Sequence, residues 1–306
     1  MATIVLVHGI AQEQYGPDLL EAQWLPALAS GVRSAGHGVL ADQLWRGQRP
    51  GVLEVRMAFY GNVFLDPGAQ GGGGPVGAED AELTERIAEA WLATAAEQAA
   101  EQRDRLEAQR YLDNSVLGTD GAQGLGRKAR PAANALTKLK WFAPFGFGMA
   151  GKFVNRSLDQ VSRYLAEEAV RAHAQQQVLD LIGPETRLVI GHSLGSVVAY
   201  EALHRTERPV ALVTLGSPLA LQSIIYPLLR PQPPTVPAAL TRWENLADRD
   251  DIVAAHLDLA RYFPPAPGRE VVPTSHPELD NGSSPHDVAN YLTKKSVGRI
   301  IAESLS

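Results

Sequence analysis

Short apolar runs alternate along this chain with longer segments that carry apolar residues at helical spacing. The runs lie at residues 3–7, 53–60 and 188–190, and from residues 210, 241 and 269 onward. Such runs are typical of strands that are buried on both faces of a parallel sheet. Helical spacing is found at residues 21–34 and 194–203, and again after residue 287. This alternation predicts an α/β fold with a doubly wound, mostly parallel sheet.

The segment 66–156 interrupts the alternation. It opens with the glycine-rich stretch DPGAQGGGGPVGA, which lacks the Lys-Ser or Lys-Thr pair of a phosphate-binding loop. Apolar residues on one helical face predict a single long amphipathic helix over 79–112. An aromatic patch follows at 141–154. We expect 66–156 to form a largely helical lid or cap, inserted into a core domain that consists of 1–65 and 157–306.

The spacing of Ser157 and Gln160 is that of a capping box, and it predicts that the next helix begins there. This helix should continue to about Leu181 and end before the Gly-Pro pair at 183–184, since these two residues commonly follow a helix. It would lead directly into the strand at 188–190.

A serine between two glycines stands where that strand pattern changes to a helical one. In the stretch VIGHSLGSVV, Ser193 follows Gly191 and precedes Gly195. Glycines allow strained dihedral angles and a close approach of strand and helix, and the helix N-terminus favours developing negative charge. The alternative is a chance match in which the serine only caps the helix. The flanking strand and helix favour a nucleophile elbow with Ser193 as the nucleophile.

A serine nucleophile needs a base, usually histidine, that a carboxylate orients. In the chain order of this motif the acid comes after the serine, and the histidine comes last. Asp248, Asp250 and Asp251 cluster where the strand from residue 241 ends. Asp251 is the preferred acid because it directly precedes Ile-Val, while the other two remain alternatives that can simply cap a turn.

Two histidines follow the acidic cluster and could supply the base. His286 lies in SSPHDVANYL, on a loop before the last helix, whereas His276 lies one loop segment earlier. The position after the last strand favours His286 and leaves His276 as the alternative. His192 flanks the nucleophile and is expected to orient the elbow.

The oxyanion of an acyl-transfer intermediate needs two backbone donors. One should be the N–H of Leu194, the residue after the nucleophile at the helix start. The other should come from the loop after the first strand, where the sequence HGI is followed by alanine. We expect the N–H of Ile10 to serve, with Ala11 as the less favoured alternative.

Composition narrows the function classes. The formal net charge is −6 and charges of both signs are interspersed, so a nucleic-acid surface is not expected. The chain has no cysteine, which excludes disulfides and thiolate chemistry and fits a reducing compartment. Neither a signal peptide nor a transmembrane segment is expected, so we predict a cytoplasmic protein. No metal-binding or dinucleotide motif appears, and no cofactor is expected. The oligomeric state stays open.

Five segments together resemble the α/β-hydrolase superfamily, nearest its lipase and esterase branch. They are VLVHGI, VIGHSLGSVVAYEAL, LVTLGSP, the W-x-N-x-x-D-x-D-D-I-V segment and SPHDVANYL. The resemblance covers 1–65 and about 157–306, and it implies Ser193, Asp251 and His286 as nucleophile, acid and base. The chain departs from the common pattern because it opens at the His-Gly strand, without preceding antiparallel strands, and carries a large insertion.

These observations predict a serine hydrolase that cleaves a small-molecule ester or lipid-like substrate with an apolar acyl chain, through an acyl-enzyme on Ser193. An acyltransferase with the same triad is one alternative, and a catalytically silent hydrolase fold used as a binding module is another. Phe145 and Phe147 belong to the aromatic patch, which either packs the insertion onto the core or forms a mobile lid that receives an acyl chain.

Overall fold

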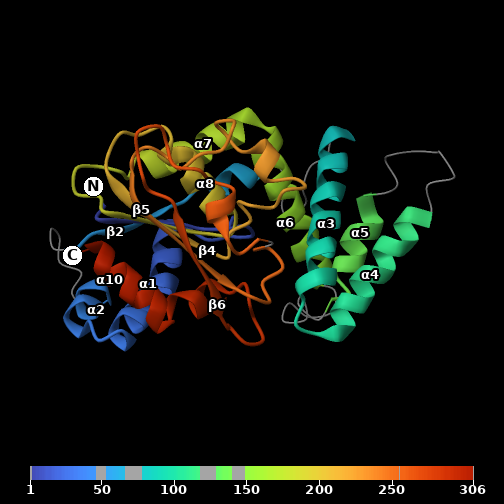
Figure 1. Cartoon of the computed structure of the whole chain (residues 1–306), viewed down its shortest axis with the longest axis horizontal. Coiled ribbons are helices and arrows are strands. Elements are labelled where there is room, and N and C mark those ends of the chain that lie inside the picture. The colour runs from blue at the N-terminus through green and yellow to red at the C-terminus, as the bar shows by residue number, and fades with distance from the viewer. Residues whose placement is uncertain are drawn as a thin grey trace.

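Six parallel strands form the centre of the part of the chain that the structure describes (Figure 1). The structure is a computed structural model, and it describes residues 2–45, 53–65, 78–117, 129–139, 149–254 and 256–305. The strands are β1 (Ile4–Val7), β2 (Val55–Ala58), β3 (Leu188–His192), β4 (Val210–Leu215), β5 (Leu240–Asp248) and β6 (Pro273–Leu279). Their order in the sheet is β2-β1-β3-β4-β5-β6, and every neighbouring pair is parallel. The predicted α/β fold with a parallel sheet is confirmed.

Helices cover both faces of this sheet. They are α1 (Pro17–Ser34), α2 (Gly38–Trp45), α3 (Ala78–Gln98), α4 (Gln102–Leu117), α5 (Ala129–Leu136), α6 (Met149–Ala166), α7 (Glu168–Leu179), α8 (Leu194–Leu203), α9 (Val288–Leu292) and α10 (Lys295–Leu305). Short 3₁₀ helices lie at Gly61–Phe64, Tyr226–Leu228 and Leu259–Arg261. Because side chains alternate along a strand, Ile4 and Leu6 of β1 join the core beneath α1, α2 and α10, whereas Val5 and Val7 join the core beneath α7 and α8.

The strand order brings two loops together at one edge of the sheet. The chain runs outward from β1 to β2 and then returns to place β3 on the other side of β1. The registers pair Val7 of β1 with Gly191 of β3, so both strands end at the same level. Loops that leave neighbouring strands in opposite directions at their carboxyl ends open a crevice. The loop after β1 and the turn after β3 meet there.

The chain does not form the single helix that was expected over 79–112. Helices α3 and α4 are separated at residues 99–101 and lie side by side, with α5 beside them and α6 between this group and the sheet (Figure 1). Arg105 donates to the carbonyl oxygens of Ala99 and Ala100, and the Tyr111 hydroxyl donates to Glu85 across the two helices. The expectation was wrong because reversal of the chain lets the two apolar faces bury each other, a tertiary gain that helical periodicity does not record.

Helix α6 begins before the predicted start at Ser157. It starts at Met149, so Ser157 lies inside the helix, fully buried, and does not cap it. The chain then breaks at Glu167 before α7, where a continuous helix to Leu181 was expected. Helix α6 therefore joins the segment 66–156 to the remainder of the chain without a boundary at 156, and the division into two domains stays a prediction.

Two helices cross at a contact between glycines. A Cβ atom on Gly31 of α1 would lie 2.1 Å from the carbonyl oxygen of Leu292, and a Cβ on Gly298 of α10 would lie 2.1 Å from the carbonyl oxygen of Gly31. Only glycine permits backbones to approach this closely. The contact holds α9 and α10 tightly against α1, which also contributes to the pocket described below.

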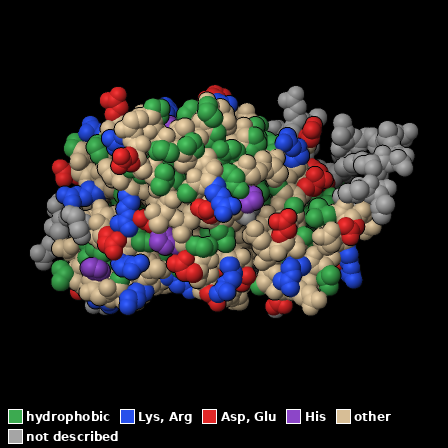
Figure 2. All heavy atoms as spheres, in the orientation of Figure 1, with side chains coloured by type: hydrophobic (Ala, Val, Ile, Leu, Met, Phe, Trp, Pro, Cys, Tyr) green, Lys and Arg blue, Asp and Glu red, His purple; other side chains and the backbone are tan. Residues whose placement is uncertain are grey.

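Charged side chains of both signs are interspersed on the face in view, as Figure 2 shows, in agreement with the sequence pattern. No helix in the described ranges is both long enough and apolar enough to cross a membrane.

Candidate active site

Ser193 occupies a strained turn between β3 and α8. Its backbone angles are φ 54° and ψ −131°, a region that residues other than glycine rarely adopt. Its N–H donates to the carbonyl oxygen of Leu215 at 3.0 Å, which fixes the turn against the end of β4. The predicted strand-turn-helix geometry is present, and the strain at a single serine is what a nucleophile elbow imposes.

The glycines around Ser193 are required by packing. A Cβ on Gly191 would lie 2.8 Å from the carbonyl oxygen of Gly195, and a Cβ on Gly195 would lie 2.3 Å from the carbonyl oxygens of Val7 and His8. Any side chain at either position would therefore collide with backbone that cannot move independently. The two glycines allow α8 to start directly beside the ends of β1 and β3.

His286 and Asp251 form a hydrogen-bonded pair, although they are far apart in sequence. Nδ1 of His286 lies 2.7 Å from Oδ2 of Asp251. Because a carboxylate only accepts, Nδ1 carries the proton, and Nε2 is the basic nitrogen of the neutral ring. Asp251 is fully buried, and its two oxygens also accept from the Tyr291 hydroxyl at 2.8 Å and from the Val253 N–H at 3.0 Å.

These contacts keep Asp251 ionised. Burial by itself raises the pKa of the carboxyl group, but the charge and hydrogen bond of His286, the Tyr291 hydroxyl and the Val253 N–H outweigh burial and hold the pKa of Asp251 below its usual value. A charged carboxylate at this position stabilises an imidazolium on His286 and fixes the orientation of the ring.

Gly216 lies directly beside the Asp251–His286 pair. It follows β4 with a positive φ of 53°, and a Cβ there would lie 2.7 Å from Oδ2 of Asp251 and 3.0 Å from Nδ1 of His286. The loop after β4 therefore needs glycine for its conformation and for the room that the Asp251–His286 pair occupies.

His192 links the nucleophile strand to the loop of His286. Its Nε2 lies 2.9 Å from the carbonyl oxygen of His286, which only accepts, so Nε2 is the donor. The two imidazole rings are 4.7 Å apart between centroids. Burial, together with the nearby His286, lowers the pKa of His192 to about 3 and keeps this ring neutral. His192 therefore holds the loop of His286, a contact beyond the predicted orientation of the elbow.

The side chains of Asp248 and His276, one alternative acid and the alternative base, have other partners. Asp248 accepts from the N–H groups of Asp250 and Asn281, so it organises the turn after β5. Nε2 of His276 lies 2.7 Å from Oε2 of Glu244 on the neighbouring strand. Of the candidates drawn from the sequence, Asp251 and His286 are the acid and the histidine that the structure brings together.

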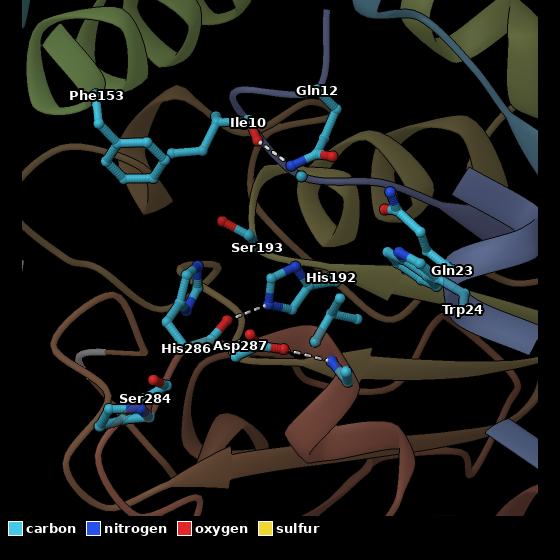
Figure 3. A pocket seen from close by; sticks show the side chains of 14 residues that line it. Ile10, Gln12, Gln23, Trp24, Phe153, His192, Ser193, Ser284, His286 and Asp287 are labelled. Carbon is cyan, nitrogen blue, oxygen red and sulfur yellow. Dashed lines mark hydrogen bonds between the residues drawn. The ribbon is translucent and has the colours of Figure 1, made fainter. Parts of the chain in front are cut away.

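Ser193 and His286 line the same pocket, which has a volume of about 420 Å³. Both side chains point into it in Figure 3. The pocket is lined by Gly9, Ile10, Gln12, Gln23, Trp24, Phe153, His192, Ser193, Ser284, Pro285, His286, Asp287, Val288 and Ala289. These residues come from the loop after β1, from α1, α6 and the β3 elbow, and from the segment that begins α9, so the pocket lies at the predicted edge of the sheet.

The loop after β1 brings Ile10 to the pocket. The ring of His8 anchors the loop, because its Nε2 accepts from the Tyr60 N–H at 3.2 Å and its Nδ1 then donates to the Gly9 carbonyl at 2.7 Å. The N–H of Ala11, the less favoured oxyanion donor, donates to Oε1 of Gln160 at 2.7 Å. Because the Ala11 N–H already has this partner, the N–H of Ile10 is the preferred candidate for an oxyanion donor on this loop. Leu194 is the first residue of α8, next to Ser193.

The predicted acyl-binding residues Phe145 and Phe147 lie outside the described residues. Phe153, from the same aromatic patch, is described on α6 and lines the pocket. Sequence reasoning missed Tyr291, Gly216 and Gln160. Tyr291 and Gly216 stand within motifs that the sequence singled out, but their contacts depend on how distant segments pack.

A search of protein-family models, of curated proteins and of solved structures gave no match to this chain. In the described ranges, no group of three or more histidine, aspartate or glutamate side chains has the arrangement of a metal site.

Proposed function

We propose that this protein is a serine hydrolase with a doubly wound α/β-hydrolase fold, and that it cleaves carboxylic esters through an acyl-enzyme on Ser193. One observation carries the proposal. Ser193, in a strained turn after a central parallel strand, lines the same pocket as His286, and Nδ1 of His286 is hydrogen-bonded to the buried Asp251. Nucleophile, base and acid occur in this order along the chain, as in the α/β-hydrolase motif.

In the first half of the reaction, Oγ of Ser193 attacks the ester carbonyl carbon while Nε2 of His286 takes the hydroxyl proton. Asp251 stabilises the imidazolium that forms. The carbonyl oxygen gains negative charge and accepts hydrogen bonds from the N–H groups of Ile10 and Leu194. The intermediate collapses when its C–O bond breaks, and His286 returns the proton to the departing alcohol.

In the second half, water enters the site and His286 removes a proton from it. The hydroxide attacks the acyl carbon, the bond to Oγ of Ser193 breaks, and the serine recovers its proton from His286. The carboxylic acid leaves, and the enzyme is restored.

The pocket wall supports a substrate with an apolar acyl group. Ile10 and Phe153 lie together on one side of the pocket in Figure 3, and Phe153 belongs to the segment proposed as a lid. Each methylene that such a wall buries contributes about 0.8 kcal/mol of binding. Values of kcat/KM over p-nitrophenyl esters from acetate to palmitate test this assignment, and a preference for acetate would exclude it.

Covalent labelling tests the reaction class without knowledge of the substrate. A fluorophosphonate probe should modify Ser193 in the folded wild-type protein, and peptide mapping should find the adduct on that residue. Ser193→Ala should abolish labelling. Ser284→Ala is the matched control, because Ser284 lines the same pocket, and it should label like wild type. Failure of the folded wild type to react would favour a binding module over an enzyme.

A further inference from the structure

The loop of residues 8–13 has its first three carbonyl groups bound to side chains. His8 O accepts from the Tyr60 hydroxyl at 2.6 Å, Gly9 O accepts from the His8 ring at 2.7 Å, and Ile10 O accepts from the side chain of Gln12 at 3.2 Å. With these oxygens engaged, the loop can direct an N–H group at an oxyanion in the pocket. The direction of that N–H depends on what holds the loop at its next residue.

Ala11 is that next residue, and its backbone is strained. Its φ of 59° lies in the left-handed region, which alanine adopts only when the surroundings impose it. The N–H of Ala11 donates to Oε1 of Gln160 at 2.7 Å. Gln160 is buried on α6, with an exposed fraction of 2%. A contact from a distant helix thus fixes the peptide between Ile10 and Ala11.

The rest of the Gln160 side chain holds the same loop at a second point. Nε2 of Gln160 donates to Oε2 of Glu13 at 2.7 Å, and Oε1 of Glu13 pairs with Arg156 at 2.8 Å. An amide accepts at one end and donates at the other, so it satisfies the Ala11 N–H and the Glu13 carboxylate together. Neither a carboxylate nor an apolar side chain of the same length can do both.

We propose that Gln160 is a positioning residue for the oxyanion hole: it holds the strained Ala11 peptide so that the N–H of Ile10 faces the oxyanion that forms on the ester carbonyl. This assignment rests on the proposed function. Gln160 is not among the residues that line the pocket, so its effect reaches the reaction through the loop. Loss of the Gln160 amide should therefore lower kcat with little effect on KM, because a misplaced oxyanion donor weakens binding of the transition state specifically.

Gln160→Glu tests the assignment because it removes the donor and places two carboxylates side by side. At neutral pH it should lower kcat by about 10- to 100-fold, against about 100- to 1000-fold for loss of an oxyanion donor itself, and leave KM within about threefold. As pH falls, the ratio of variant to wild-type kcat should rise. A protonated carboxyl group again offers an oxygen to Ala11 and a hydroxyl to Glu13, and the ratio cancels groups that both proteins share.

A reciprocal exchange distinguishes positioning from general damage. In the double variant Glu13→Gln with Gln160→Glu, the introduced carboxylate can accept from both the Ala11 N–H and the introduced amide, whose oxygen can accept from Arg156. This variant should recover kcat to within about threefold of wild type. Gln176→Glu is the control, because it also replaces an amide that donates to a carboxylate, Asp180 at 2.6 Å, but on the exposed surface of α7, and it should change kcat by less than about twofold.

Each outcome decides between the two proposals. If wild type neither labels nor cleaves esters, the proposed function fails. If wild type labels and Gln160→Glu keeps full kcat at neutral pH, the proposed function stands and the role of Gln160 is overturned. The role is overturned as well if the double variant does not recover, or if neither variant folds by circular dichroism, because the amide would then be only structural.

Discussion

Two histidines contact buried carboxylates near the neighbouring strands β5 and β6, one pair within the strands and one pair after them, and the two contacts have the same length. His286 lies 2.7 Å from Asp251, and His276 lies 2.7 Å from Glu244. The surroundings differ. Glu244 also pairs with Arg242 at 2.5 Å. Asp251 receives neutral donors besides the histidine, and His286 lines the pocket of Ser193, whereas His276 is not among its lining residues.

The difference shows that a short His–carboxylate distance does not by itself identify a catalytic pair. An arginine already neutralises Glu244, so little of its charge remains to stabilise an imidazolium. Asp251 keeps its charge because its other donors are a hydroxyl and a peptide N–H. The pair proposed to assist proton transfer is the one whose carboxylate has no competing cation in the described structure and whose histidine lines the same pocket as Ser193.

The largest effect is expected when the two pairs are broken in turn. Asp251→Asn should lower kcat by about 10³- to 10⁴-fold, because the amide favours the wrong tautomer of His286 and cannot stabilise its charge. Glu244→Gln, the matched change in the other pair, should alter kcat by less than about threefold. Ester hydrolysis by both purified variants checks this. Equal losses would show that the two pairs do not differ in the way proposed.

A smaller effect is expected from Gly216→Ala, which forces a methyl group against Asp251 and His286. We expect kcat to fall by about 100-fold, since an error of about 1 Å in a catalytic group can cost that much. Gly268→Ala is the control: its φ is 73° and a Cβ would meet nothing within 4 Å. Gly268→Ala should introduce similar backbone strain, so it should lower the unfolding free energy by a similar amount while kcat stays unchanged. Loss of activity in both would indicate general destabilisation.

Tyr291→Phe tests the contribution of a hydroxyl that the Asp251–His286 pair has and the Glu244–His276 pair lacks. It removes the group that accepts from the Asp248 N–H at 2.9 Å and donates to Asp251 at 2.8 Å. Unfolding free energy should fall by about 1–3 kcal/mol, and kcat by about 10-fold. Tyr200→Phe also deletes a buried hydroxyl, bonded to the Thr235 carbonyl at 2.8 Å, so it should cost similar stability without the loss in kcat. Urea titrations and kinetics separate the two.

The smallest effect concerns His192, which packs beside His286. Burial lowers the pKa of His192 to about 3 and that of His8 to about 4. Below the unfolded pKa of about 6.5, the unfolded chain binds protons that the folded chain does not, so stability falls as pH decreases. Each ring should lower the unfolding free energy by about 1.4 kcal/mol between about pH 7.5 and about pH 5.5.

Urea unfolding at these two pH values, for wild type and His192→Gln, measures the contribution of this ring. The variant keeps an amide N–H for the His286 carbonyl and should lose the share of the pH dependence that His192 supplies. An unchanged pH dependence in the variant would mean that His192 is not held neutral in the folded protein.

The parts of this fold and site that the sequence predicted are those with local causes. Ser193 could be found because strand, turn and helix are adjacent in sequence and the serine stands between required glycines. Asp251 and His286 could be chosen because acid and base follow in order on loops at the same edge of a parallel sheet.

The parts that the sequence did not predict depend on contacts between distant segments. Nothing in the composition of residues 99–101 marks the reversal between α3 and α4, since neither glycine nor proline stands there. The start of α6 was hidden by the glycines of the aromatic patch. The contacts of Tyr291 and Gln160 depend on how their helices pack against distant segments, and periodicity carries no information about such contacts.

The crossing of α1 and α10 at Gly31 and Gly298 also determines when, during synthesis of the chain, the pocket can form. A ribosome makes α1, with Trp24 of the pocket, early and makes Ser193 well before His286, while α10 comes after both. A ribosome adds about 5–20 residues per second, and domains generally fold as their chains emerge. A chain that has emerged only as far as α8 thus carries Ser193 without Asp251 and His286, so the proposed site can form only after the segment that contains α9 and α10 has docked on α1.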